Sequence, residues 1–184
     1  MTHLDVAAIK ADFPILSRTV RDGRGLVYLD SGATSQKPLP VLNAEREFYE
    51  RHNAAAHRGA HQLAEEATIA YENARRTIAT FVGGEPDELV FTKNATESLN
   101  LVAQSWGRAN LRHGDVVVLT HMEHHANIVP WHMLAAERGI VLRWVPLTDD
   151  GQLDLATLPE LLEGAKAFSF TAMSNVLGTI NPVT

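Results

Sequence analysis

Short apolar runs alternate with amphipathic segments along the second half of the chain. Runs rich in valine and other large apolar residues predict strands at residues 116–119, 140–145 and 167–171. Apolar residues at helical spacing predict helices between them, at residues 128–138 and 155–162. Strands that alternate with helices are typical of a parallel sheet with helices on both faces. The pattern therefore predicts an α/β fold with a mainly parallel sheet.

The first half of the chain has a stronger helical pattern. Helical spacing recurs at residues 5–11, 38–48, 61–81 and 95–108, and short apolar runs predict strands at 26–29 and 89–92. The longest predicted helix has an apolar stripe, made by Leu63, Ala67, Ala70, Ala74, Ile78 and Phe81. Gly83 and Gly84 predict its end. An N-terminal helical segment is thus expected before the sheet.

Composition narrows the class of protein. The 184 residues are 45% hydrophobic and 21% charged, which is ordinary for a globular protein. No apolar run approaches the ~18 residues that span a bilayer, and residues 1–10 lack a secretory signal, so we expect a cytoplasmic protein. The net charge of −6 argues against a nucleic-acid partner. The absence of cysteine excludes disulfides, thiolate metal sites and cysteine nucleophiles from this sequence.

The segments that follow the predicted strands are candidate binding sites, because ligands of open α/β sheets bind beyond the carboxyl ends of the strands. These segments are residues 30–34, 93–97, 121–127 and 172–178. In the second, Asn94 and Glu97 have the spacing of a capping box at a helix start. Such a cap leaves the amides of Ala95 and Thr96 directed outward as an anion site. A well-capped helix without a ligand also explains the pattern.

The segment at residues 121–127 holds three histidines within five residues. A zinc-protease motif needs glutamate where Met122 and His124 stand, and no third ligand is nearby, so a metal site is not expected. The flat imidazole of a histidine at a strand end could instead stack on an aromatic cofactor ring. A surface turn with incidental histidines is the alternative.

Three further candidates rest on weaker signals. Apolar flanks on both sides of Asn175 predict that its amide is at least partly enclosed and needs a protein or ligand partner. The small residues Gly32 and Ala33 allow the backbone to approach a ligand closely. Arg58, which follows His57, could bind an anionic substrate group, although a solvated loop arginine is the commoner case.

Taken together, these segments resemble the pyridoxal-phosphate (PLP) enzymes of the class V aminotransferase group, in particular the Suf-type, or group II, cysteine desulfurases. The resemblance covers nearly the whole chain, and the block from Met122 to Trp131 is its most specific part. The motifs that carry it are Ala11-Asp12-Phe13-Pro14-Ile15-Leu16, Tyr28-Leu29-Asp30-Ser31, Gln36-Lys37-Pro38, His57-Arg58-Gly59, Ser105-Trp106-Gly107-Arg108, Met122-Glu123-His124-His125-Ala126-Asn127-Ile128-Val129-Pro130-Trp131 and Ser174-Asn175-Val176-Leu177-Gly178.

The resemblance implies a role for each candidate residue. The residues that would bind pyridoxal 5'-phosphate are Ala95, Thr96, His124 and Asn175. The first two would hold the phosphate, the imidazole would stack on the ring, and the amide would bond the ring hydroxyl or the substrate carboxylate side. The residues near the substrate would be Gly32, Ala33, His57 and Arg58. Many relatives have a second hydroxyl residue at position 95, so the alanine here would cost one donor to the phosphate.

The same resemblance implies an incomplete PLP-transferase large domain. Residues 1–25 would belong to the small domain and residues 26–184 to the N-terminal part of the PLP-binding large domain. No catalytic residue is expected within the chain, because the Schiff-base lysine and the nucleophilic cysteine would lie beyond Thr184. The family converts L-cysteine to L-alanine and passes the sulfur, through an enzyme persulfide, to an acceptor protein of the Suf system for iron–sulfur cluster assembly. We therefore expect an inactive part of a homodimeric desulfurase, without nucleic-acid or membrane partners.

Two other functions stay open at this stage. A selenocysteine lyase or another class V PLP enzyme would share the fold and would differ mainly in residues that this sequence does not contain. A non-catalytic metal-binding or scaffold module would lack the catalytic lysine and cysteine altogether.

Overall fold

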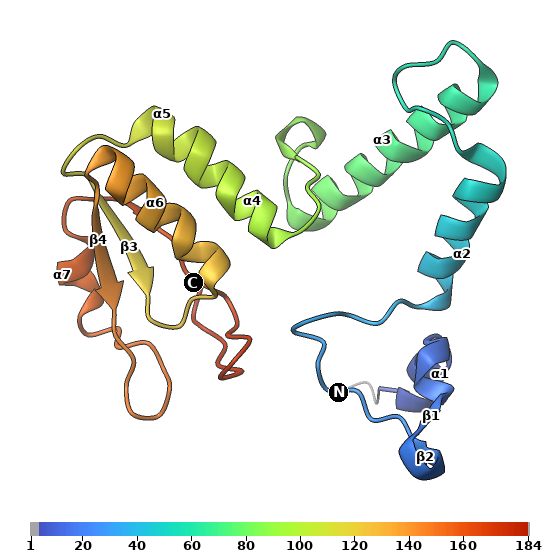
Figure 1. The fold of residues 1–184 in the computed structure, drawn as a ribbon, viewed down its shortest axis with the longest axis horizontal. Helices are drawn as coiled ribbons and strands as arrows, with labels where there is room; N and C mark the ends of the chain where they lie inside the picture. Colours follow the sequence, from blue (N-terminus) through green and yellow to red (C-terminus); the bar gives the residue numbers. More distant parts are fainter. Residues whose placement is uncertain (1–3, 184) are drawn as a thin grey trace. The chain divides into compact units, whose positions relative to one another are not determined.

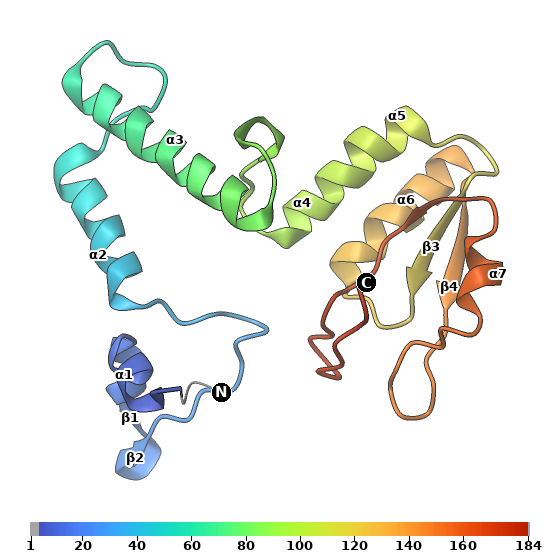
Figure 2. The same ribbon diagram turned by 180° about the vertical axis from the view of Figure 1, so that it is seen from behind.

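The computed structural model describes residues 4–183 of the chain. Contacts between Cα atoms divide the chain into two compact units, Met1–Val90 and Phe91–Thr184, called here the N-unit and the C-unit. In Figure 1 the N-unit is coloured from blue to green and the C-unit from yellow-green to red, and Figure 2 shows the reverse side. The domain boundary predicted after residue 25 is a division of another kind and stays a prediction.

The C-unit is built on a parallel sheet of three strands in the order β4-β3-β5. The central strand β3 (Val116–Thr120) pairs with β4 (Val141–Val145) from Val116 opposite Val141 to Thr120 opposite Val145. On its other side it pairs with β5 (Ala165–Phe168), with an irregularity in the register after Val116. All five residues of β3 are buried, which explains their unbroken apolar run.

Helices cover both faces of this sheet, as the sequence predicts (Figure 1 and Figure 2). Successive side chains of a strand point to opposite faces. On one face Val117 and Leu119 pack with Trp131 and Leu134 of α6 (Val129–Arg138). On the other, Val116 and Val118 belong to a cluster that includes Leu158 and Leu161 of the α7 region (Leu158–Leu162). The predicted α/β class is confirmed.

The helix predicted at residues 95–108 has three parts. It starts as the α-helix α4 (Ala95–Val102), continues as the π-helix η5 (Ala103–Gly107) and ends as the short α5 (Arg108–Asn110). Ala103 and Gly107 are both buried. A Cβ atom on Gly107 would lie 2.9 Å from Leu134 Cδ2, so a glycine is required where this helix approaches α6.

The N-unit consists of helices and one small antiparallel ladder. The ladder pairs β1 (Thr19–Val20) with β2 (Arg24–Gly25). The α-helices are α1 (Val6–Ala11), α2 (Leu39–Glu47) and α3 (Gln62–Val82). Shorter helical turns are η1 (Pro14–Ser17), η2 (Arg21–Gly23), η3 (Phe48–His52) and η4 (Pro86–Glu88), while η6 (His125–Asn127) belongs to the C-unit. In the described part of the chain, no helix has the length and apolar composition needed to cross a bilayer.

Two of the predicted strands are absent, and the predicted helix stripe is wrong in part. Residues 26–29 and 89–92 are not strands, since neither pairs with any other segment among residues 4–183. A strand needs a neighbour for its backbone hydrogen bonds, and Leu29 is 91% exposed. In α3 the buried residues are Ala64, Ala67 and Ala79, whereas Phe81 is 89% exposed. The predicted end of α3 is confirmed, because Gly83 adopts the left-handed conformation at φ 76°.

Candidate functional site

The start of α4 has the predicted cap. Asn94 Oδ1 accepts a hydrogen bond from the Glu97 amide at 3.0 Å. The Glu97 carboxylate reaches back one residue further than a standard capping box, because Oε2 accepts from the Lys93 amide at 2.6 Å. Oε1 of the same carboxylate lies 3.6 Å from Lys93 Nζ. The cap and the ion pair therefore hold the carboxylate beside Lys93.

This cap satisfies the third amide of the helix and leaves the first two, those of Ala95 and Thr96. Amides of a first helical turn have no acceptor within their own helix. Both residues are exposed, and the Thr96 carbonyl already accepts from Asn100 Nδ2 at 2.8 Å. With the positive end of the helix dipole, these amides and the Thr96 hydroxyl form a site that fits a phosphate group.

His124 lies in the turn after β3. Its Nδ1 accepts a hydrogen bond from the Ala126 amide at 3.1 Å, so the neutral imidazole carries its proton on Nε2. The residue is exposed, which leaves the ring faces open to a flat ligand. The helix α4 packs against η6, the turn that follows His124. The structure therefore brings α4 and the histidine segment together in one compact unit.

The neighbouring His121 has a structural contact. Its ring stacks on Trp144, with ring centres 5.7 Å apart and planes inclined by 29°. His132 lies against the same indole at a similar distance. Among the described residues, no three histidine or carboxylate side chains gather into a group that could hold a metal ion.

The predicted enclosure of Asn175 is wrong in this structure. Asn175 is exposed at the start of a turn, and its apolar neighbours Val176 and Leu177 are exposed as well. The buried polar residue is Ser174, whose Oγ accepts from the amides of Val176 and Leu177 at 3.2 and 3.0 Å. The turn satisfies its own buried group through this hydroxyl, so the amide of Asn175 extends outward.

The four residues predicted near the substrate all lie in the N-unit. Gly32 and Ala33 form an exposed turn, which Tyr28 stabilises by donating its hydroxyl proton to the Thr34 carbonyl at 2.6 Å. The four residues predicted to bind the cofactor all lie in the C-unit. Each set is therefore placed by the local structure of its own unit.

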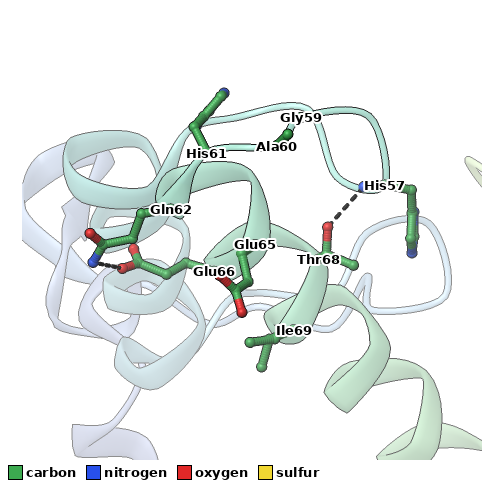
Figure 3. A pocket seen from close by; sticks show the side chains of 9 residues that line it. All are labelled: His57, Gly59, Ala60, His61, Gln62, Glu65, Glu66, Thr68 and Ile69. Carbon is green, nitrogen blue, oxygen red and sulfur yellow. Dashed lines mark hydrogen bonds between the residues drawn. The ribbon is translucent and has the colours of Figure 1, made fainter.

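His57 and Arg58 lie in the loop that precedes α3. His57 adopts a left-handed conformation at φ 61°, and its amide donates to Thr68 Oγ1 at 2.8 Å (Figure 3). Its Nε2 lies 3.0 Å from Glu72 Oε1, while Arg58 is exposed. A groove of about 970 Å³ lies beside this loop, lined by His57, Gly59, Ala60, His61, Gln62, Glu65, Glu66, Thr68 and Ile69.

Sequence reasoning missed two polar residues of the histidine segment. Glu123 accepts hydrogen bonds from Thr120 Oγ1 at 2.6 Å, from Asn127 Nδ2 at 2.7 Å and from the Thr171 amide at 2.9 Å. Asn127, which is 5% exposed, accepts from Trp131 Nε1 and Ser169 Oγ. A carboxylate directly after a buried strand, followed four positions later by an amide, was the only available signal.

The fold, the phosphate-sized donor site at a helix start and the exposed histidine after the central strand define a class of protein. Residues 27–184 match the family described as "Aminotransferase class-V", and the chain belongs to this family, whose members depend on PLP. The resemblance predicted from the sequence is thereby confirmed.

The relatives are cysteine desulfurases. The chain is 56% identical over 188 residues to "Probable cysteine desulfurase 2" of Mycobacterium leprae, and covers 100% of this chain and 45% of that protein. It is 51% identical to the cysteine desulfurase of Escherichia coli (strain K12 / DH10B), over 97% of this chain and 44% of that one. The solved apo cysteine desulfurase of Thermococcus onnurineus NA1 has a TM-score of 0.89 at 38% identity, covering 100% and 44%. The chain thus spans less than half the length of these relatives.

Proposed function

We propose that this chain is the amino-terminal part of a PLP-dependent cysteine desulfurase, which converts L-cysteine to L-alanine and leaves the sulfur as a persulfide on a cysteine of the enzyme. The observation that carries the proposal is the packing of α4, with its outward first-turn amides, against the turn that follows His124. The identity to cysteine desulfurases over the whole chain supports the same activity.

The C-unit residues would hold the cofactor. The amides of Ala95 and Thr96 and the Thr96 hydroxyl would bind its phosphate, and His124 would stack on its ring. The exposed amide of Asn175 would bond the ring hydroxyl or the substrate carboxylate. The cofactor supplies an electron sink when bound, while the protein orients the substrate and excludes competing reactions.

The remaining parts of the enzyme follow from the family. Gly32, Ala33, His57 and Arg58 would lie near the substrate, and the catalytic lysine and cysteine would be supplied by residues outside this sequence. We further propose a small domain over residues 1–25, a large domain from residue 26, a homodimer, a cytoplasmic location and a sulfur-acceptor protein of the Suf system. The whole chain would then serve iron–sulfur cluster assembly.

The test uses the whole protein, purified with PLP. His124→Ala should shift the visible spectrum of the bound cofactor and lower the rate of alanine formation from cysteine, because the ring loses its stacking partner. His125→Ala, a change of the adjacent exposed histidine, is the matched control and should leave the spectrum unchanged. Wild-type protein that binds PLP but forms no alanine would contradict the proposed activity.

A second variant tests the phosphate site. Thr96→Val should weaken retention of the cofactor by roughly 1–3 kcal/mol, the range for a lost hydrogen bond to a charged group. Cofactor retention is measured by dialysis and absorbance, with Thr80→Val in α3 as the control. Unchanged retention in Thr96→Val would contradict the assignment of this helix start to the phosphate.

A further inference from the structure

We propose that Glu123 and Asn127 form a positioning pair, which fixes the turn bearing His124 against the segment that leads to Asn175. This inference rests on the proposed function, because it concerns the two segments that would hold the cofactor ring. Neither residue is assigned any contact with the cofactor. The pair acts through the hydrogen bonds that join the two segments.

The Glu123 carboxylate binds three different parts of the C-unit. Oε1 accepts from Thr120 Oγ1 at the end of β3 and from the Thr171 amide, which lies after β5. Oε2 accepts from Asn127 Nδ2 in η6, at 2.7 Å. One side chain therefore ties the ends of two neighbouring strands to the turn that contains His124.

The Asn127 amide can adopt only one orientation. Its Oδ1 accepts from Trp131 Nε1 at 3.1 Å and from Ser169 Oγ at 2.8 Å, so its nitrogen must face Glu123. A flipped amide would place its NH₂ group against the indole N–H, which can only donate. Among the described residues, no buried side-chain nitrogen or oxygen lacks a partner, so the network is complete.

The same region anchors the turn that bears Asn175. The strand β5 ends at Phe168, so the sheet itself no longer determines the position of residues 169–175. Thr171 is held by Glu123 on one side, and its carbonyl accepts from Asn181 Nδ2 at 2.7 Å. The Asn181 amide also donates to the Ala172 carbonyl at 2.9 Å. Glu123 is thus the link between the histidine turn and the base of the Asn175 turn.

The donor and acceptor pattern predicts how substitutions behave. Glu123→Gln places an NH₂ group opposite either the Asn127 NH₂ or the Thr171 N–H, and each choice sets a donor against a donor. Asn127→Asp alone sets two carboxylates against each other. The double change Glu123→Gln with Asn127→Asp restores every pair, because the new amide donates to the new carboxylate. The double variant also keeps the net charge.

The experiment compares these three variants in the whole PLP-loaded protein, with the exposed Glu160→Gln as the control. Each single variant should change the circular dichroism of the bound cofactor and weaken its retention by about tenfold or more, while the double variant recovers to within about threefold of wild type. In the cofactor-free protein, the Thr171 amide should exchange with solvent faster in each single variant and return to the wild-type rate in the double variant.

Two results would overturn the inference. The first is a double variant that is as impaired as the worse single variant in both measurements. The second is a pair of single variants with wild-type Thr171 exchange. A wild-type protein that binds no PLP would instead contradict the proposed function, and the exchange of Thr171 in the cofactor-free protein would still decide whether the pair holds the two segments.

Discussion

The two units of this chain are stabilised by interactions of different range. In the C-unit, Val117, Leu119 and Leu134 are at most 1% exposed and meet across a sheet whose strands are separated by helices. In the N-unit the described buried apolar residues are three alanines of α3, Ala64, Ala67 and Ala79. The N-unit consists mainly of helices with local caps and turns. The comparison teaches that local signals suffice to form helices, whereas strands form only where a distant segment supplies a partner.

Large apolar side chains sharpen this contrast. Several in the N-unit are strongly exposed, among them Leu4, Val27, Leu29, Phe81 and Val82. Removing apolar surface from water contributes roughly 25 cal/mol per Å², and an exposed side chain contributes little of this. Equal substitutions in the two units should therefore have unequal effects on stability.

The largest difference is expected for leucine truncation. Leu119→Ala should lower the free energy of unfolding by about 2–5 kcal/mol, because it leaves a cavity beneath α6. Leu29→Ala, its matched control in the N-unit, should change stability by no more than about 0.5 kcal/mol, since Leu29 is 91% exposed. Urea denaturation with amide exchange in β3 measures both. Effects of similar size would remove the distinction between the units.

A smaller difference is expected at two helix ends with the same backbone conformation. Gly83 has φ 76° with open space around its Cβ position, whereas a Cβ on Gly139, at φ 69°, would lie 2.5 Å from His113 Cδ2. Alanine at either position should cost about 1–2 kcal/mol for the left-handed conformation. Gly139→Ala should cost about 1 kcal/mol more, because the imidazole must move.

The excess is attributable to one neighbour and can be tested directly. In a His113→Ala background, Gly139→Ala should cost the same as Gly83→Ala, because the clash is absent. Thermal unfolding of the four proteins measures the difference. An excess that persists without the imidazole would show that another contact restricts Gly139.

Helix caps should affect the two units alike. Asp5 Oδ1 accepts from the Ala8 amide at 3.0 Å, and Asn94 Oδ1 accepts from the Glu97 amide at the same distance. Asp5→Ala and Asn94→Ala should each destabilise their helix by about 1 kcal/mol, measured as faster exchange of the capped amide. A clearly larger effect for Asn94 would mean that its cap depends on tertiary packing as well as on local bonds.

The smallest effect concerns a single carboxylate of the N-unit. The pKa of Glu66 is lowered from 4.5, first by its hydrogen bond to His52 at 2.8 Å and then by the one from Gln62. Because the folded-state pKa is depressed, the stabilisation is present above pH 4.5 and is lost as the pH falls through the folded-state pKa. His52→Leu should raise the pKa of Glu66 toward 4.5, which carboxyl NMR titration measures. An unchanged pKa would rule out His52 as the main cause.

The sequence was sufficient wherever a signal and its partner lie close together. The Asn94 cap and the left-handed Gly83 depend on neighbours within one turn, and the apolar run at residues 116–119 marks a strand buried on both sides. Glu123 and Asn127 could not be assigned in this way, because they bond Thr171 and Ser169, which lie 48 and 42 residues away. The same reason explains the error at Asn175, where the flanking apolar residues contact solvent and the neighbouring Ser174 is enclosed.

The π-helix η5 has a consequence for how this family can change in length. Each residue of an α-helix advances the chain by about 100° around the axis, so removal of one residue from Ala103–Gly107 would turn α5 by about that angle relative to α4. Either the outward amides at the start of α4 or the close approach of Gly107 to Leu134 would then be misdirected. Insertions and deletions should therefore accumulate in the loops around this helix and be excluded from the helix itself.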